Sequence, residues 1–423
     1  SKTHVYHSSV KENSTQKRLL NTFIQKTYRG SAMQLVMQAL GNQKASSEEI
    51  EELKKMIKSI EEANWWVYSL KWYSKNSLSN EIWKFTELNT ANILKKFKNV
   101  NSNLEEYTNG WTYYGIKTWY NKAFIINELE RNKILEIDRK SFPILKKMVE
   151  GDDFSAWDLQ HSWRHMLATW YDTNIQNEYK GVYEFLNQYK EELIKRKDQW
   201  KNYWNLRACD YYDLLEQPKI IYYHTAVNHW FYYDTEWYYI SANCYFIANA
   251  DKYLQVILNS ALFGYVKKFL FPAFGDSEKW WRVRLDANKM NKLPIKKIPF
   301  SEQTPFIEKA DFMLENNKFM WEKVQKFLKR VQGTFELEKM SKKLQTFYEL
   351  SFEEFVKELK KAKVILSLKD QDEWEEYFES YKTEIVELKT KIDACDREID
   401  EMVFDLYGLS KEEREVVINS QNK

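Results

Sequence analysis

The chain has 423 residues, and its 64 Lys and Arg nearly balance its 62 Asp and Glu, so the formal charge of +2 excludes a polybasic protein that binds nucleic acid through net charge alone. No apolar run approaches the roughly 18–20 residues of a membrane span, and the start at Ser1 lacks a signal-peptide pattern, so we expect a soluble, cytoplasmic protein without membrane contacts. Three widely separated cysteines exclude a CxxC zinc site and a disulfide framework, and they fit a reducing compartment.

Glycine is scarce and tryptophan is abundant. Average usage of about 7% would give about 30 glycines, whereas the chain has 10 glycines and 17 tryptophans. The sequence contains neither GxGxxG nor GxxxxGK[ST], so neither a dinucleotide-binding motif nor a P-loop motif can be recognised in it. It also lacks any Pro-Pro dipeptide, so the Asn/Asp-Pro-Pro-aromatic tetrapeptide of amino-methyltransferases is absent.

Residues 1–104 are polar, and we expect them to be mainly helical. The cap at Ser47 precedes an amphipathic helix, and the apolar pattern over residues 83–97 predicts another. Residues 105–300 have a different sequence pattern, because short β-prone runs alternate with helical stretches at residues 182–197 and 252–269. The predicted strands are at 111–114, 123–126, 219–222, 231–233, 238–240 and 244–247. This pattern predicts an α+β domain, and Pro294, Pro299 and Pro305 mark its end.

Residues 301–423 predict a mostly helical region with a long coiled-coil-like helix. This region has a net charge of −7, against +9 for residues 1–300. An unbroken heptad seam runs through Trp374, Phe378, Tyr381, Ile385, Leu388, Ile392, Cys395, Ile399, Met402 and Leu406. Gly408 follows as the predicted helix end. The pattern is typical of a spacer or interaction scaffold, and it leaves open whether the seam pairs within the chain or forms a helix-mediated oligomer.

No catalytic residue and no metal site can be argued from the residues. His161 and His165 are four apart but lack an acidic or cysteine partner at matching spacing, and His224 and His229 are a weaker pair. Glu-x-Lys pairs resembling nuclease motifs lie on Glu/Lys-rich helices and are interpreted as solvated faces.

Cations, aromatics and amides recur together between residues 105 and 300. They do so at residues 117–121, 163–165, 201–205 and 279–284. Lys and Arg neutralise phosphates, Asn and Arg read base edges, and aromatic rings stack on bases or sugars. Composition alone leaves nucleic-acid binding, carbohydrate binding and general protein interaction open.

Five stretches resemble, in order, the motifs of one domain family. Residues 115–126 are similar to the opening pattern Gly-Ile-x-Thr-Gly-x-Asn-x-Ala-Phe-x-Ile of the TaqI-like target-recognition domain, found in type IIG restriction–modification enzymes and N6-adenine DNA methyltransferases. Further matches follow at residues 151–154, 217–222, 258–263 and 292–299, and residues 399–409 resemble the helix that ends such chains. The resemblance covers about 105–420.

The resemblance implies sequence-specific recognition of duplex DNA, as the specificity part of a bacterial restriction–modification defence system. Residues 1–104 would then be a linker or the end of a methyltransferase region, 105–300 the recognition domain, and 301–423 the helical spacer. A methyltransferase subunit or domain is the implied partner. S-adenosylmethionine and Mg²⁺ are expected only there, and no cofactor is expected in this chain.

Six residues are the predicted DNA contacts. Lys117, Lys219, Arg282 and Arg284 would bind phosphates or guanines, while Thr118 and Asn121 would contact the DNA backbone or adenine. Only Lys117, Thr118, Asn121 and Lys219 stand at positions that match the motifs.

The chain departs from the family pattern at several glycines. Trp119 replaces the second glycine of the opening motif, Trp280 and Trp281 stand where a glycine-rich turn is common, and Asp152 replaces an arginine. Trp170, Trp200 and Trp237 also fall at turn-like positions. Two interpretations stay open. The tryptophans are genuine substitutions, or the sequence carries errors at positions where the protein has glycine.

Two alternative functions remain. The chain could be the C-terminal part of a single-chain type IIG methyltransferase and endonuclease whose catalytic half lies elsewhere. It could also be a helical scaffold or an aromatic-rich carbohydrate-binding protein that does not bind nucleic acid.

Overall fold

The structure is a computed structural model that describes residues 88–160, 162–197, 201–274 and 282–420. Residues from Lys96 onward belong to one compact unit, which joins the expected recognition and spacer regions. The helix predicted after Ser47 lies outside the described residues, and the next is observed from Leu88 as α4 (Leu88–Lys98). Among the residues described, no helix combines the length and the apolar character that crossing a bilayer requires.

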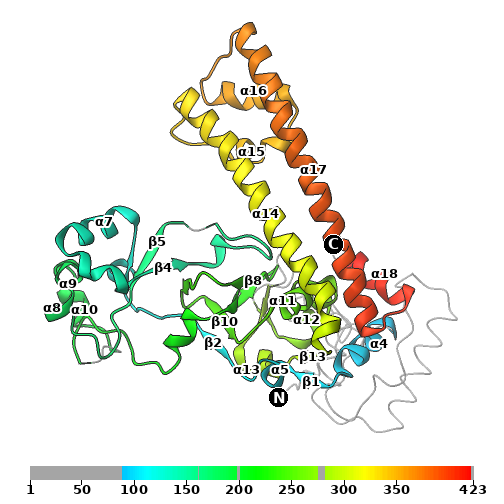
Figure 1. Cartoon of the computed structure of the whole chain (residues 1–423), viewed down its shortest axis with the longest axis horizontal. Helices are drawn as coiled ribbons and strands as arrows, with labels where there is room; N and C mark the ends of the chain where they lie inside the picture. Colours follow the sequence, from blue (N-terminus) through cyan, green and yellow to red (C-terminus); the bar gives the residue numbers. More distant parts are fainter. Residues whose placement is uncertain (1–87, 161, 198–200, 275–281, 421–423) are drawn as a thin grey trace, which may run out of the picture. The chain divides into compact units, whose positions relative to one another are not determined.

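The first sheet is antiparallel and forms the centre of the α+β part (Figure 1). Its order is β2 (Thr112–Tyr114), β10 (Cys244–Ala248), β6 (Lys219–Tyr223) and β8 (Phe231–Asp234). The two central strands are almost wholly buried, which explains why both read as continuous apolar runs. Helix α11 (Lys252–Asn259) packs on β8 and continues after a break at Ser260 as α12 (Ala261–Leu270).

A second sheet has the order β3 (Ile125–Ile126), β5 (Arg164–Leu167), β4 (Leu145–Val149) and β9 (Tyr239–Ile240). Helices α7 (Glu128–Ile137) and α9 (Lys180–Asn187) pack together beside it. A smaller sheet joins β11 (Ala273–Phe274), β12 (Arg282–Arg284) and β7 (Thr225–Ala226). Short connecting elements are β1 (Ser102–Asn103), α5 (Leu104–Thr108), α6 (Asn121–Phe124), η2 (Arg139–Ile144), η3 (Gly151–Asp153), α8 (Ile175–Glu178), α10 (Lys190–Leu193), η4 (Tyr212–Glu216), α13 (Ala287–Asn291) and β13 (Pro294–Ile295).

Most predicted strands of this region are confirmed, as is the α+β class. The stretch at 123–126 is an exception, because its first half ends helix α6 and only Ile125–Ile126 pair as a strand. The helix predicted over 182–197 is split into α9 and α10, and that over 252–269 is split at Ser260. The Ser260 hydroxyl accepts a hydrogen bond from the Phe263 N–H and so caps α12.

The two larger sheets are joined where the chain leaves β2. The Gly115 N–H donates to the Cys244 carbonyl at 2.9 Å, and the Ile116 N–H donates to the Ile240 carbonyl at 2.8 Å. Ser241, which bridges Ile116, lies between β9 of one sheet and β10 of the other. A Cβ on Gly115 would lie 2.8 Å from the Ile240 oxygen and closer still to the Ser241 carbonyl. Only glycine therefore allows the two backbones to approach this closely.

The C-terminal region is helical as predicted, and its seam pairs within the chain. Helix α14 (Phe300–Phe335) and helix α17 (Leu368–Tyr407) run side by side in opposite directions (Figure 1). Ion pairs Lys309–Glu398 and Lys323–Glu384 step in opposite directions along the two helices, as antiparallel packing requires. The seam is buried from Phe378 to Ile399 at its heptad positions, except at Tyr381, which is half-buried. In the last turns Val403, Phe404 and Tyr407 are buried, in place of the predicted Met402 and Leu406.

The connection between these helices is filled by aromatic rings. Helix α15 (Lys342–Gln345), the turn η5 (Phe347–Glu349) and helix α16 (Phe352–Lys361) cross the ends of α14 and α17. The Phe327 and Phe347 rings stack at 3.7 Å, and Phe355 and Phe378 lie 5.0 Å apart. Stacked and edge-to-face rings favour one packing arrangement over others, so this cluster fixes the hairpin.

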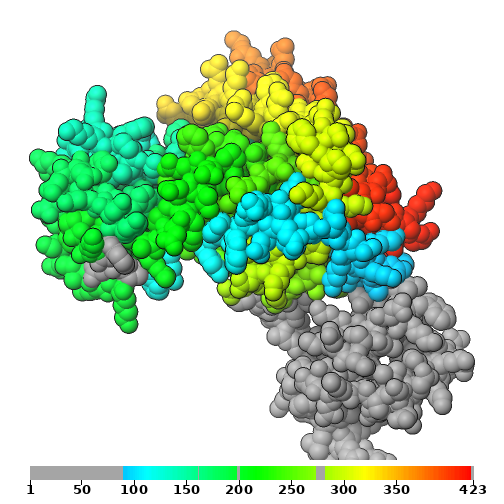
Figure 2. Space-filling view, turned by 60° about the horizontal axis from the view of Figure 1, so that its bottom comes forward, coloured from blue at the N-terminus to red at the C-terminus, as the bar shows by residue number. Residues whose placement is uncertain are grey.

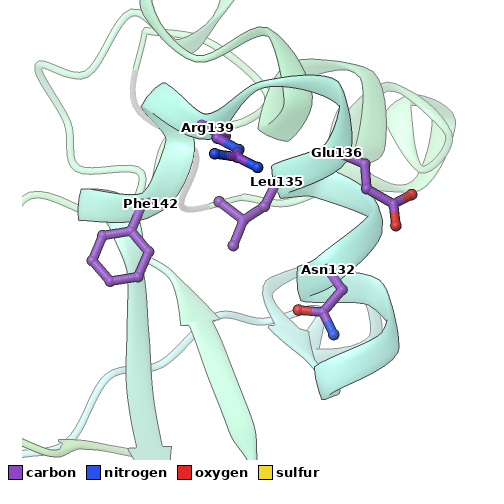
Figure 3. Close-up of a pocket in the computed structure, with 5 residues that line it drawn as sticks. All are labelled: Asn132, Leu135, Glu136, Arg139 and Phe142. Carbon is purple, nitrogen blue, oxygen red and sulfur yellow. The ribbon is translucent and has the colours of Figure 1, made fainter.

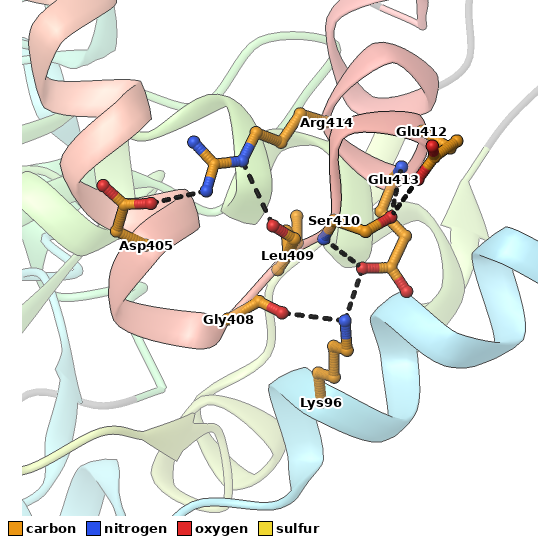
Figure 4. A network of polar contacts seen from close by, with 8 residues as sticks. All are labelled: Lys96, Asp405, Gly408, Leu409, Ser410, Glu412, Glu413 and Arg414. Atoms are coloured by element: carbon orange, nitrogen blue, oxygen red, sulfur yellow. Dashed lines mark hydrogen bonds and ion pairs between the residues drawn. The ribbon is translucent and has the colours of Figure 1, made fainter.

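A polar cluster holds the end of α4 on the C-terminal helices (Figure 4). Gly408 ends α17 in the left-handed conformation, as predicted, and α18 (Lys411–Asn419) follows. The Lys96 ammonium donates to the Gly408 carbonyl at 2.7 Å and pairs with the buried Glu413 at 2.6 Å. Phe97 stacks on Tyr407 at 5.1 Å, and the space-filling view shows the two chain segments in contact (Figure 2).

Asp400 links the long helix α17 to the start of α12. Its carboxylate accepts a hydrogen bond from the Ala261 N–H at 2.7 Å. Burial, with smaller contributions from Asp396 and Glu401, raises the pKa of Asp400 from 3.8 to about 7. Because the folded protein binds this proton more tightly than the unfolded chain, the ionised carboxylate lowers stability as the pH rises from about 4 to 7.

We therefore predict that Asp400→Asn stabilises the protein at alkaline pH. The amide oxygen can still accept from Ala261, while the buried charge is removed. The free energy of unfolding should increase by roughly 2–4 kcal/mol above pH 8, and the difference from the wild type should disappear near pH 4. Urea unfolding at pH 4, 6 and 8 measures this, and an equal effect at all three values would contradict it.

We also predict that Gly115→Ala destabilises the protein by about 1–3 kcal/mol, because the added methyl group forces the sheet junction apart. Gly333→Ala is the matched control. That glycine lies within helix α14 with no atom near its missing Cβ, so alanine should stabilise by about 0.5–1 kcal/mol. Thermal unfolding of both variants tests the pair, and similar shifts in both would contradict the assignment of Gly115.

Candidate nucleic-acid interface

A buried arginine, Arg196, holds the loop at residues 117–121 in place. It follows the Gly115 junction and ends at helix α6. The Arg196 guanidinium is buried and donates to the Thr118 carbonyl at 3.2 Å, and also to the Tyr203 and Asn205 carbonyls. It lies over the Phe124 ring at 4.7 Å. A single buried cation therefore connects this loop to two other segments of the chain.

The loop exposes two of its three predicted DNA contacts. Lys117 and Asn121 are exposed, whereas Thr118 is only 2% exposed and its hydroxyl donates to the Asn121 side-chain oxygen. The prediction that Thr118 contacts DNA is therefore wrong for this conformation. Thr118 orients Asn121 instead, because its hydroxyl fixes the amide oxygen and leaves the amide nitrogen available.

Lys219 is the clearest correction, because it is fully buried in β6. Its ammonium pairs with the buried Asp234 carboxylate at 2.5 Å and donates to the Leu215 carbonyl at 2.7 Å. Burial lowers the pKa of Lys219, while Asp234 opposes that shift. A buried, paired cation cannot reach a phosphate without leaving its carboxylate partner in an apolar core. Lys219 is thus a structural residue.

Strand β12 presents both predicted arginines to the same side. Arg282 and Arg284 are exposed, and Val283 between them is buried, as strand alternation requires. The pairing of Val283 with Ala226 and of Arg284 with Thr225 fixes the register. These two arginines remain predicted DNA contacts, as do Lys117 and Asn121.

Aromatic rings connect β12 to β2. Burial raises the pKa of the Tyr245 hydroxyl to about 12, and the nearby Arg284 guanidinium lowers it by a smaller amount. The Tyr245 ring stacks on His224 at 4.9 Å and meets the Tyr114 ring edge-on at 4.6 Å. Tyr114 is 51% exposed, and Lys117 follows it three residues later. Ring contacts from Tyr114 through Tyr245 to His224, whose carbonyl accepts from the Leu285 N–H at 2.8 Å, thus link the end of β2 to the end of β12, and the exposed side chains of these linked segments are the candidate surface.

We call this the β2–β12 surface, defined by Tyr114, Lys117, Asn121, His224, Asn243, Arg282 and Arg284. It combines cations with exposed side-chain amides at Asn121 and Asn243 and an exposed ring at Tyr114. Such a set can neutralise phosphates, hydrogen-bond base edges and stack on a base or sugar. Sequence analysis missed Tyr114, His224 and Asn243, because only the pairing of β2, β10 and β6 brings them together.

The histidines and carboxylates do not form a metal centre within the described part of the chain, where no group of three suitable ligands occurs. His161 lies outside the described residues, and His165 lies on strand β5, with Glu128 3.7 Å away. His229 is buried beside Lys267, and burial lowers the pKa of His229 to about 3. His165 and His229 are packed residues.

A hollow of about 690 Å³ lies on the outer side of α7 and η2 (Figure 3). Leu135 faces it between Arg139 and Phe142, with Asn132 and Glu136 along the helix. Its single cation is offset by Glu136, and Phe142, Arg139 and Asn132 are all exposed. Mixed charge and an open shape give it no evident preference for an anionic ligand.

Comparisons with known proteins cover parts of the chain. A family model for a domain of unknown function, DUF8810, matches residues 300–403, and a penicillinase repressor model matches residues 1–59, outside the described residues. No curated protein matches. Among solved structures, the chain is similar to the type IIL restriction-modification enzyme MmeI in complex with DNA, with 14% identity and a TM-score of 0.37. The match covers 69% of this chain and 36% of that one, so the chain spans about a third of the length of MmeI.

Proposed function

We propose that this chain binds duplex DNA sequence-specifically, as the recognition part of a cytoplasmic restriction–modification system of the TaqI-like, type IIG kind. The observation that carries the proposal is the β2–β12 surface, where exposed cations, amides and a ring stand on chain segments that ring contacts and a backbone hydrogen bond link together. N6-adenine methylation and cleavage would be performed by catalytic parts outside it, which would bind S-adenosylmethionine and Mg²⁺.

Each group on the surface has a defined role in this proposal. Lys117 neutralises a phosphate, and the arginines of β12 bind phosphate or the O6 and N7 atoms of guanine. The amide of Asn121, oriented by Thr118, pairs with adenine, whose N6 and N7 atoms match an amide. Tyr114 stacks on a base or a sugar.

The α14–α17 hairpin serves as the spacer that docks the methyltransferase subunit or domain. The apolar seam of α17 packs on α14 within the chain, so docking would use the faces of the two helices that point outward. Those faces carry many acidic residues, and exposed rings at Phe312 and Phe319 lie among them on α14. A single-chain type IIG arrangement, in which the methyltransferase precedes residue 1, uses the same surface.

We predict that the purified chain enriches a short motif from a randomised duplex library, and that affinity falls steeply between 50 and 200 mM salt, as about six phosphate contacts would require. The triple variant Lys117→Gln, Arg282→Gln, Arg284→Gln should weaken binding at least tenfold and flatten the salt dependence. The matched control, Lys357→Gln, Lys360→Gln, Lys363→Gln, removes the same charge from exposed lysines on and after α16 and should leave binding unchanged.

Equal losses in the two triple variants would mean non-specific attraction and would contradict the assigned surface. Failure to bind duplex DNA even at low salt would reject DNA recognition by this chain alone. Binding of an oligosaccharide array instead would favour the carbohydrate-binding alternative.

A further inference from the structure

Three tryptophans occupy backbone conformations that normally belong to glycine. Trp119, Trp163 and Trp237 have φ angles of 58°, 57° and 62°. A side chain in this left-handed region brings its Cβ close to the following carbonyl, which is unfavourable for a bulky residue. Gly408 is the only glycine in this region among the described residues, where seven other residues also adopt it.

The surrounding hydrogen bonds impose these conformations. At Trp237, the Asp234 carboxylate accepts from the Glu236 N–H at 2.8 Å and from the Tyr238 N–H at 2.9 Å, so it fixes the turn on both sides. Asp234 is itself held by Lys219. The backbone at 237 therefore cannot relax without disturbing a buried ion pair.

The other two positions are fixed in the same way. Trp119 lies between Thr118, whose carbonyl accepts from Arg196, and the start of α6. Trp163 lies between Ser162 and Arg164, and the Arg164 side chain bonds to the Ser162 hydroxyl and to Asp153. Contacts of the neighbouring residues thus hold each turn.

The indoles themselves are mostly in solvent. Trp119, Trp163 and Trp237 are 58%, 67% and 55% exposed. Burial of the ring therefore offers little compensation for the unfavourable backbone. At Trp119 the ring has a further consequence, because the Lys117 ammonium lies 3.6 Å from its centroid. This cation–π contact covers the cation that the proposed function assigns to a phosphate.

We infer that residues 119, 163 and 237 are glycine positions of this fold. The working form of the protein, by which we mean the protein made by its own cells, then carries glycine at these positions, and Lys117 is uncovered. The shortage of glycine across the chain and its excess of tryptophan agree with this inference. The part that concerns Lys117 rests on the proposed function, whereas the backbone part does not.

The backbone part is tested by Trp119→Gly, Trp163→Gly and Trp237→Gly in the full chain. Each should raise the Tm by about 2 °C, because glycine relieves the left-handed strain. Trp111→Gly is the matched control, because Trp111 is 52% exposed but lies outside the residues with positive φ, so its Tm should stay the same or fall. Lower Tm values for all three test variants would overturn the inference.

The Lys117 part is tested by duplex DNA affinity at fixed salt. Trp119→Gly should bind about two- to fivefold more tightly than the wild type, and the gain should vanish in the Lys117→Gln background. A gain that persists without Lys117, or a loss, would reject this part. If no variant binds DNA while the Tm values rise, the proposed function fails and the backbone inference stands.

The residue carried by the working form is read from peptide masses of the protein isolated from the cells that make it. Glycine at positions 119, 163 and 237 is the expected result. Tryptophan at these positions would overturn the inference about the working form, whatever the variants show.

Discussion

The close approach of the backbones at Gly115 and Ser241 is the constraint on which the rest of the α+β part depends. It ties β2 to the segment between β9 and β10, and so joins the two larger sheets at one point. The loop that carries Lys117 and Asn121 leaves directly from this junction, and β10 carries Tyr245, whose ring stacks on His224. Because Gly115 has no side chain, the two sheets can approach closely, and this fixes the point at which the Lys117 loop leaves them.

Buried charges also hold two turns of the α+β part in place. Arg196 binds three carbonyls, one of them in the Lys117 loop, and the Lys219–Asp234 pair holds the turn that contains Trp237. Removal of one member of such a pair leaves the other charge buried and unpaired, which is costly. The predicted DNA-contacting cations thus divide into the buried Lys219, which holds a turn, and the exposed Lys117, Arg282 and Arg284.

How far the sequence predicts this structure differs between its parts. Most of the α17 seam was predictable, because a heptad period is a local signal, and burial confirms it from Phe378 to Ile399 except at the half-buried Tyr381. The helix that pairs with this seam could not be predicted, because an apolar stripe can pack on α14 or on another chain equally well. Lys219 was misassigned because a lysine at a strand start looks exposed until its partner, fifteen residues later, is known to be buried. Tyr114, His224 and Asn243 meet only through strand pairing, which no spacing in the sequence reveals.

The central claim is that duplex DNA binds the β2–β12 surface, and hydrogen–deuterium exchange of the full chain with and without saturating duplex tests it most directly. Slow exchange in a complex reports which backbone segments the ligand covers or orders. Our account predicts protection of peptides that cover residues 113–121, 243–245 and 282–284, with no change in helix α16 (Phe352–Lys361). Protection confined to the helical hairpin, or none in the three interface segments, would contradict it.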